Sequence, residues 1–146
     1  MESIQNKKAY FDYAIAETME TGIELSGHET RAIRAGKAAL AGAVIKIYGG
    51  QLWLVGATIG PYQEKNTPPG FDPKRARRLL AHKKEIGTLA GAVQSKHLTL
   101  VPLKLYNKGG KIKLEIGLAK SRLKGDKREA IKKRETERAI RKRSEV

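Results

Sequence analysis

Residues 98–118 read LTLVPLKLY NKGG KIKLEIGL, two arms rich in apolar residues around a segment that ends in two glycines. In the second arm, residues 111–118, apolar and charged side chains alternate, which is typical of a strand with one buried and one wet face. Pro102 has no backbone N–H, so the first arm is either an edge strand or carries a bulge. The stretch predicts an antiparallel hairpin.

Two further stretches, residues 44–55 and residues 10–25, have strand character. Residues 44–48 and 51–55 flank Gly49 and Gly50, the arrangement of a two-residue hairpin whose turn needs positive φ. Residues 10–25 mix aromatic and β-branched residues with polar ones and are interrupted at Gly22, so we expect two short strands or one bent strand there.

Helix signals stand between these strands. Ser26 is followed three residues later by Glu29, a capping box that predicts a short helix over residues 27–35, ended by Gly36. Asp72 and Pro73 resemble an N-cap and a first helical position, so a second helix is expected over residues 73–86.

Gly87 and Gly91 then predict that the segment up to residue 95 is broken or forms two helices. Hairpins with inserted helices indicate a mainly β protein, a small closed antiparallel barrel of the oligonucleotide-binding (OB) type. We assign residues 1–119 to this barrel domain and residues 120–146 to a basic C-terminal tail.

The tail carries twelve Lys or Arg residues against five Asp or Glu, so it contributes +7 of the chain's net charge of +15. It offers too little apolar surface to fold by burial. Asp126 and Glu129 have the spacing of a helix cap, so we expect a tail that is disordered alone and helical when its charges meet phosphates. A polyanion, with nucleic acid first, is the expected partner.

Catalysis and metal binding are not indicated. The chain has no Cys, its three His residues are far apart in sequence, and neither a phosphate-binding Gly-rich loop nor a nucleophile elbow occurs. We therefore expect no enzyme activity, no metal and no cofactor. A start without a signal peptide and the absence of a long apolar run predict a cytoplasmic protein without a membrane partner.

The densest basic cluster comprises Lys74, Arg75, Arg77 and Arg78, at the start of the expected second helix. Free amides and the helix dipole bind phosphate at such a position, so we favour an RNA contact over a merely solvated charged face. Aromatic residues can stack on bases, but at strand positions more of them are expected in the core.

These features together resemble the SmpB family, small proteins that partner transfer-messenger RNA in bacterial ribosome rescue. The matching segments are, in order, residues 6–9, Tyr13, residues 20–29, residues 34–37, Pro61 and Tyr62, residues 72–80, His82, residues 101–103, Tyr106, residues 117–120 and residues 126–128. Each segment alone is weak, and their order and spacing are specific.

The resemblance implies an OB-type barrel that holds the tRNA-like domain of transfer-messenger RNA, while the tail enters the decoding region and the empty mRNA channel of a stalled ribosome. It implies that Glu20 and Leu80 belong to the RNA-contacting surface. Their expected neighbours on this surface are Asn6, Lys7, Lys74, Arg75, Arg77, Arg78 and His82. In the tail, the expected ribosome contacts are Asp126, Lys127, Arg128, Lys132, Lys133 and Arg134.

The chain departs from the family pattern at the start of the tail. Residues 121–123 read SRL where Gly-Lys-Lys is usual, and Gly125 replaces a His or aromatic residue suited to stacking on a ribosomal base. A generic OB-fold RNA binder, such as a ribosomal or initiation-factor-like protein, is the alternative. Peripheral membrane binding through the tail is a third reading, disfavoured because the tail has no large apolar face.

Overall fold

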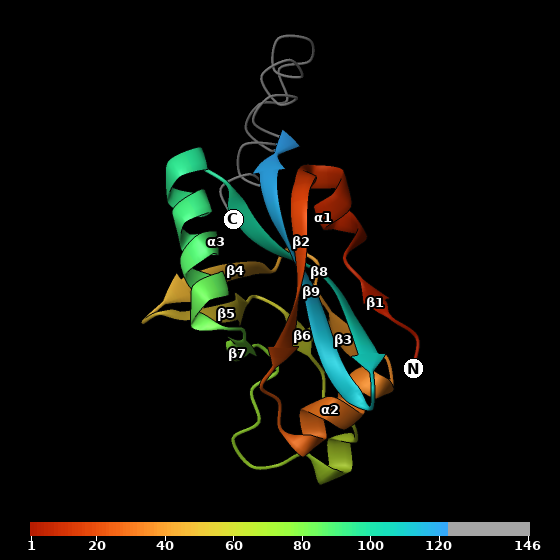
Figure 1. Ribbon diagram of the computed structural model, residues 1–146. Helices are drawn as coiled ribbons and strands as arrows, with labels where there is room; N and C mark the ends of the chain where they lie inside the picture. Colours follow the sequence, from red (N-terminus) through yellow and green to blue (C-terminus); the bar gives the residue numbers. More distant parts are fainter. Residues whose placement is uncertain (123–146) are drawn as a thin grey trace.

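The computed structural model describes residues 1–122 and shows mainly β structure with a few helices (Figure 1). The strands are β1 (Ile4–Gln5), β2 (Tyr13–Ile23), β3 (Ala38–Ala39), β4 (Val44–Tyr48), β5 (Gln51–Val55), β6 (Thr58–Ile59), β7 (Arg77–Leu80), β8 (Thr99–Lys108) and β9 (Lys111–Ser121). The helices are α1 (Lys7–Asp12), α2 (Gly27–Arg34), α3 (Lys83–Lys96) and the short 3₁₀ helix η1 (Glu64–Asn66).

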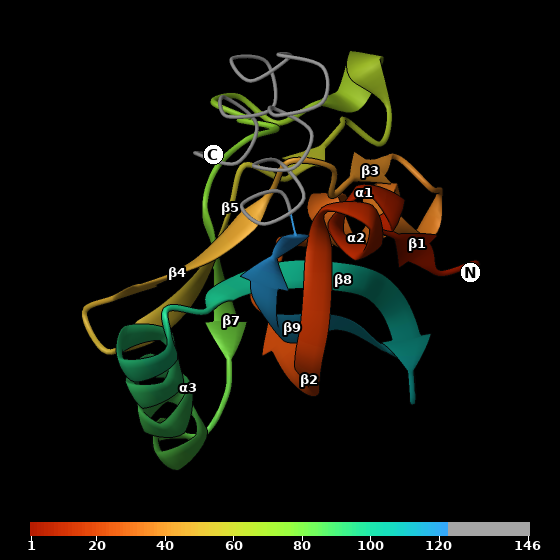
Figure 2. The ribbon, with the colours of Figure 1, turned by 90° about the horizontal axis from the view of Figure 1, so that it is seen from above.

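Seven strands form one antiparallel sheet in the order β1-β8-β4-β5-β7-β2-β9, and β8 also pairs with β9. Strands β3 and β6 form a separate pair. Helices α1 and α3 lie on opposite sides of the body (Figures 1 and 2).

The β8–β9 hairpin is confirmed, with a tighter turn than its four-residue connection suggests. Lys108 pairs with Lys111, so only Gly109 and Gly110 form the turn, with φ of 58° and 78°. The register shifts between Pro102 and Lys104, which is the bulge that proline predicted. Because β8 has β9 on one side and β1 and β4 on the other, it is not an edge strand.

The β4–β5 hairpin also forms as predicted. Tyr48 pairs with Gln51 across Gly49 and Gly50, whose φ angles are 60° and 72°. Leu52 and Leu54 on β5 are buried, while Trp53 between them points to the other face.

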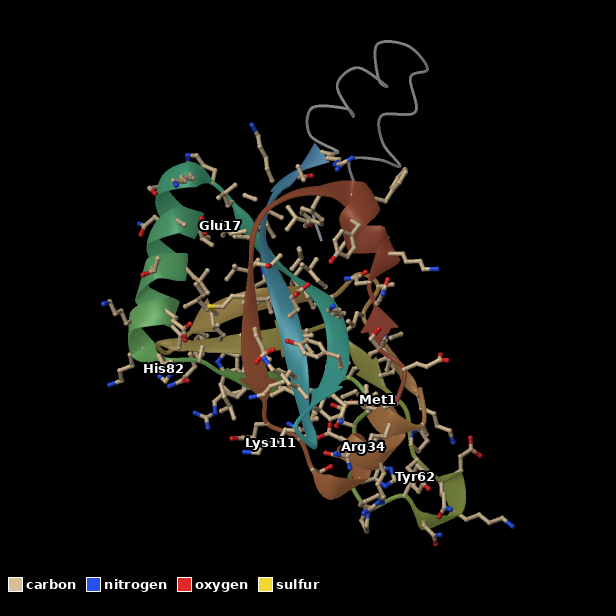
Figure 3. The ribbon with its side chains drawn as sticks, turned by 45° about the vertical axis from the view of Figure 1, so that its right-hand side comes forward. Met1, Glu17, Arg34, Tyr62, His82 and Lys111 are labelled. Atoms are coloured by element: carbon tan, nitrogen blue, oxygen red, sulfur yellow. The ribbon has the colours of Figure 1, made fainter. Side chains whose placement is uncertain are left out.

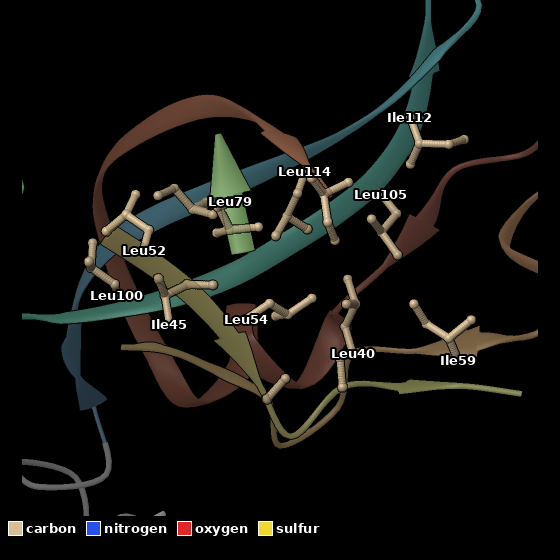
Figure 4. Close-up of a cluster of buried hydrophobic side chains, with 14 of the residues drawn as sticks. Leu40, Ile45, Leu52, Leu54, Ile59, Leu79, Leu100, Leu105, Ile112 and Leu114 are labelled. Atoms are coloured by element: carbon tan, nitrogen blue, oxygen red, sulfur yellow. The ribbon is translucent and has the colours of Figure 1, made fainter. Parts of the chain in front are cut away.

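The alternating strand residues build the core. Ile112, Leu114, Ile116 and Leu118 of β9 face the same interior as Leu52 and Leu54 (Figure 4). We call this the inner face of the strands, and the opposite face, which carries Lys111, Lys113 and Glu115, the outer face. A second small cluster of Ala9, Val101, Leu103 and Ala119 packs α1 against the outer face.

The predicted helix over residues 73–86 is wrong up to residue 82, and only residues 83–86 are helical, as the first turn of α3. Arg77–Leu80 is strand β7, hydrogen-bonded to β5 on one side and β2 on the other. Its burial alternates, with Arg77 and Leu79 inside and Arg78 and Leu80 outside, so the period is that of a strand. The gap between β5 and β2 requires a strand, and that requirement overrides the local Asp-Pro signal.

Helix α3 begins six residues after β7 starts and runs unbroken through Gly87 and Gly91, which corrects the expected break. A Cβ at either glycine would meet nothing within 4 Å, so both positions face open space. Ile86 and Leu89 on the other side are buried in the core, and this packing outweighs the low helix propensity of glycine.

Of the two arrangements expected over residues 10–25, two short strands or one bent strand, the structure has the single strand, preceded by the end of α1. Asn6 caps α1 by accepting a hydrogen bond from the Ala9 N–H at 3.2 Å, and β2 then runs from Tyr13 through Gly22 without a break there. The register of β2 against β9 shifts earlier, between Ile15 and Glu17.

Helix α2 forms as predicted and supports a first test. The Ser26 hydroxyl accepts from the Glu29 N–H at 3.1 Å, and the Glu29 carboxylate accepts from the Ser26 N–H at 2.9 Å. Ser26→Ala should lower the free energy of unfolding by about 1 kcal/mol, since it removes one cap acceptor. Urea unfolding measures this loss. Thr88→Ala, which removes only an exposed hydroxyl from the middle of α3, is the control and should change stability by less.

Candidate nucleic-acid interface

The outer faces of β2, β7 and β9 meet at Gly22. This residue pairs with Leu80 on one side and with Lys113 on the other. Two adjoining surface hollows share these three residues, and one of the hollows also includes Glu20 and His82. We call Glu20, Gly22, Leu80, His82 and Lys113 the Leu80 surface.

The absence of a side chain at Gly22 shapes this surface. A Cβ there would lie 3.1 Å from the Leu80 Cβ and 3.3 Å from its Cδ1. The Leu80 side chain can therefore lean over the backbone of β2, where it is 46% exposed. Leu80 thus offers an apolar contact between the charged side chains of Glu20 and Lys113, which line the same hollow.

Glu20 is held in place on the outer face by two side chains near the end of β8. The Tyr106 hydroxyl donates a hydrogen bond to Glu20 Oε2, and the Lys108 ammonium lies 3.3 Å from the same oxygen. The Tyr106 hydrogen bond, followed by that from Lys108, lowers the pKa of Glu20, so this carboxylate is charged at neutral pH. The pKa of Tyr106 is raised, by burial and by the hydrogen bond to Glu20.

Basic side chains surround the Leu80 surface. Lys111 and Lys113 project from the outer face of β9, and the Arg34 guanidinium at the end of α2 donates to the Gly110 carbonyl at 2.8 Å. The labelled side chains of Arg34 and Lys111 lie at one end of the sheet, with His82 across the surface at the start of α3 (Figure 3). The exposed Leu80 thus lies within a rim whose cations can meet the phosphates of a polyanion, and this rim also includes the carboxylates of Glu20 and Glu85.

The predicted basic cluster is divided by the structure. Arg77 is fully buried, and its guanidinium donates to Glu29 Oε2 at 2.9 Å, to the Ala57 carbonyl at 3.1 Å and to the Pro73 carbonyl at 3.0 Å. Arg75 forms a two-bond pair with the same carboxylate, its Nε at 3.0 Å from Oε2. Arg78 alone belongs to the outer face, beside Leu80, and pairs with Glu24 at 2.9 Å.

Glu29 is the centre of this ion-pair cluster. Its burial opposes the charged form, but hydrogen bonds from Arg75, from the Ser26 N–H and from Arg77 outweigh burial and lower the pKa of Glu29. The cluster joins α2 to the start of β7. Arg75 and Arg77 therefore have a structural role, because their ion pairs with Glu29 set the position of β7 and hence of Leu80.

The remaining predicted residues lie apart from the Leu80 surface. Asn6 is buried and donates to the Pro102 carbonyl at 2.8 Å and the Leu40 carbonyl at 3.3 Å, so it has no free surface for RNA. Lys7 is exposed on α1, which precedes β2, whereas Glu20 stands near the other end of that strand. Lys74 is exposed in the turn before β7, beside Asp72.

Sequence reasoning missed Lys113, Tyr106 and Lys108 as members of the interface. The alternation along residues 111–118 placed Lys113 on a wet strand face, but the identity of the strands beside it comes only from the pairing. The predicted ribosome contacts Asp126, Lys127, Arg128, Lys132, Lys133 and Arg134 lie outside the described residues.

Two general features of the described part bear on function. Within residues 1–122, no helix combines the length and apolar character needed to cross a membrane. In the same range, no three His, Asp or Glu side chains gather as a candidate metal site.

Comparison with known proteins shows the family of this chain. The model of the SmpB protein family matches residues 3–145. The SsrA-binding protein of Chlorobaculum tepidum is 48% identical over 139 residues, covering 94% of this chain and 88% of the relative. That of Caldicellulosiruptor saccharolyticus is 50% identical over 137 residues, covering 94% and 86%.

A solved structure shares the fold. It is described as "tmRNA-SmpB: a journey to the center of the bacterial ribosome", and one of its chains superposes with a TM-score of 0.71 at 40% identity, covering 90% of this chain and 95% of that one. The resemblance drawn from the sequence motifs is thus confirmed over nearly the whole chain. This protein belongs to the SmpB family.

Proposed function

We propose that this protein binds the tRNA-like domain of transfer-messenger RNA and brings it to stalled ribosomes, where the tail occupies the decoding region and the mRNA channel. The observation that carries the proposal is the Leu80 surface, an exposed apolar side chain within a basic rim, in a chain of the SmpB family. This is a binding role without catalysis, exercised in the cytoplasm. The generic OB-fold alternative is not favoured, because the family model spans residues 3–145.

The residues of the Leu80 surface have complementary tasks in RNA binding. Lys113 and Lys111 offer ammonium groups to phosphates. Leu80 provides an apolar contact for a ribose or base, and the charged Glu20 accepts from a base amino group or a 2′-hydroxyl. Tyr106 keeps Glu20 oriented by donating a hydrogen bond from its hydroxyl to Oε2. The other carboxylate oxygen, Oε1, is then available to RNA as well as to Lys108.

The predicted site is revised accordingly. Glu20, Arg78, Leu80 and His82 remain proposed RNA contacts, joined by Lys113. Asn6 and Arg77 become framework residues, because neither side chain reaches the surface. Arg75 is tied to Glu29, and Lys7 and Lys74 serve as peripheral phosphate contacts away from Leu80.

We retain the two-part organisation as part of the proposal. The pairings β8-β4-β5-β7-β2-β9 return to β8, which supports an OB-type barrel over residues 1–119, although a single residue pair, Ile45 with Leu100, joins β4 to β8. The first two residues of the basic segment 120–146 complete β9, which ends at Ser121, and the segment as a whole supplies +7 of charge for ribosomal RNA.

The direct test compares RNA affinities of the full chain. We expect tight binding to the tRNA-like domain of transfer-messenger RNA and markedly weaker binding to an ordinary tRNA at the same salt concentration. Equal affinity for both RNAs would refute the proposal in favour of the generic RNA binder.

A separate prediction concerns the tail. Asp126→Ala combined with Lys127→Ala should reduce peptide tagging on stalled ribosomes, because the capping residue and the phosphate contact expected from the sequence are removed together. Affinity for the tRNA-like domain should change little. Normal tagging by this double variant would show that the segment has no such role, and Ser144→Ala at the end of the tail is the control.

A further inference from the structure

A row of three side chains crosses the outer face of β4, β5 and β7. Trp53 at the centre of β5 pairs with Lys46 on β4 and with Arg78 on β7. Paired residues project from the same face, with Cβ atoms about 5 Å apart. Because Leu52 and Leu54 on either side of Trp53 are buried on the inner face, all three members of the row point outward. We call Lys46, Trp53 and Arg78 the Trp53 row.

The indole is fixed and partly exposed. Its Nε1–H donates to the Tyr48 carbonyl at 3.2 Å, which ties the ring to the tip of the β4–β5 hairpin. The next pair on the same face is Val44 with Val55, so two apolar side chains adjoin the indole. Tyr48 itself is 78% exposed at the projecting hairpin tip (Figure 1). A flat aromatic ring on a rigid strand is the usual platform for a nucleic-acid base.

The Trp53 row is continuous with the Leu80 surface. Arg78 and Leu80 are alternate residues of β7 and share its outer face. Lys46 is exposed, and Arg78 pairs with the exposed Glu24, which directly follows β2 and whose backbone N–H donates to the Arg78 carbonyl. The charges beside the indole are thus two cations and one carboxylate, and they suit the phosphates on either side of a stacked base.

We infer that an unpaired base of the RNA bound at the Leu80 surface stacks on Trp53, with its flanking phosphates against Lys46 and Arg78. This inference rests on the proposed function and extends the RNA path from β2 and β9 across β7 to the β4–β5 hairpin. RNA is the occupant that the neighbouring cations favour, because an apolar protein partner would cover Lys46, which has no ion pair among residues 1–122, without supplying a counter-charge.

The chain contains a single Trp, so its fluorescence reports on this position alone. Titrating the full-length protein with the tRNA-like domain of transfer-messenger RNA should quench Trp53 emission, with saturation at the concentration that saturates binding in a gel-shift assay. RNA-dependent protection from acrylamide quenching should accompany it. Saturable RNA binding with unchanged emission and unchanged acrylamide access would overturn the inference and leave the proposed function intact.

A second test of base stacking compares the RNA affinities of substituted proteins. Trp53→Ala should weaken RNA binding roughly five- to tenfold, and Trp53→Phe, which keeps a smaller stacking ring, should recover most of the affinity. Phe11→Ala removes a 74% exposed aromatic side chain on α1 and is the matched control, with wild-type affinity expected. Trp53→Ala with wild-type affinity would contradict base stacking.

The failure modes are distinguishable. If the wild-type protein shows no preference for the tRNA-like domain, the proposed function itself fails. Emission changes that depend on protein concentration without RNA would mean that a second copy covers the Trp53 row, which also overturns the inference. If urea titrations show that Trp53→Ala does not fold, two measurements still test base stacking. These are the RNA-dependent emission of the wild-type protein and the RNA affinity of Trp53→Phe.

Discussion

Replacing Glu29 by Gln is expected to lower the free energy of unfolding by about 3–5 kcal/mol, because it leaves the fully buried Arg77 guanidinium without its counter-charge. Losses of this size arise when one partner of a buried ion pair is removed and the other charge stays in the interior. Urea unfolding followed by circular dichroism measures the change. A loss below about 1 kcal/mol would show that the cluster of Glu29, Arg75 and Arg77 is not a determinant of stability.

The exposed pair of Glu24 and Arg78 provides the matched control. Its side chains are 59% and 36% exposed, and the distance of 2.9 Å equals that between Glu29 and Arg77. Glu24→Gln should change stability by about 0–1 kcal/mol, as exposed ion pairs do. The comparison separates the effect of burial from that of pairing.

The same cluster predicts a pH dependence. The pKa of Glu29 is lowered in the folded protein, so its contribution is fully present above the ordinary glutamate pKa of about 4.3 and is lost as the pH falls through the lower folded value. The stability difference between the wild-type protein and Glu29→Gln should therefore shrink in acid. A difference that stays constant down to pH 3 would contradict the assigned charge state.

Reversing the charge of Lys113 should weaken binding to the tRNA-like domain by about ten- to a hundredfold, or roughly 1.4–2.8 kcal/mol. Lys113 lies beside Gly22 and Leu80 in the middle of the proposed interface, on the wet face of β9. Lys113→Glu replaces a phosphate-binding cation with a second carboxylate close to Glu20. Fluorescence anisotropy with labelled RNA gives the affinity.

The control for Lys113→Glu must change the net charge equally and elsewhere. Lys96→Glu fulfils this at the C-terminal end of α3, about 20 Å along the helix from its start near His82. Lys96→Glu should lower the RNA affinity by less than about threefold, because it acts only through the screened long-range effect of the changed net charge. Lys113→Gln should also reduce the slope of log affinity against log salt by about one. Equal effects of the two reversals would remove Lys113 from the interface.

Local signals in the sequence predicted the elements whose causes are local. The two hairpins follow from alternation and paired glycines, and α2 follows from the Ser26 and Glu29 capping box, because each cause acts within a few residues. The charge of the tail and the motif order likewise needed no coordinates, and they led to the family.

The errors concern segments whose conformation is set at a distance. Asp72 and Pro73 have the local signature of a helix start, yet Arg77–Leu80 fills the place between β5 and β2, whose partner residues are about 25 and 57 positions away in the chain. Gly87 and Gly91 similarly suggested a break that core packing of Ile86 and Leu89 removed.

The strand geometry of β7 also decided which basic residues can meet RNA. In a helix, Arg75 and Arg78 would have shared one face and Arg77 would have pointed elsewhere on the helix surface. The two-residue period of the strand instead sends Arg77 into the interior against Glu29 and Arg78 outward beside Leu80. Composition and motif order thus led by themselves to the SmpB family, to which the chain belongs. Only the tertiary structure decided that Gly22, Leu80 and Lys113 form one surface, because pairing between distant strands brings them together.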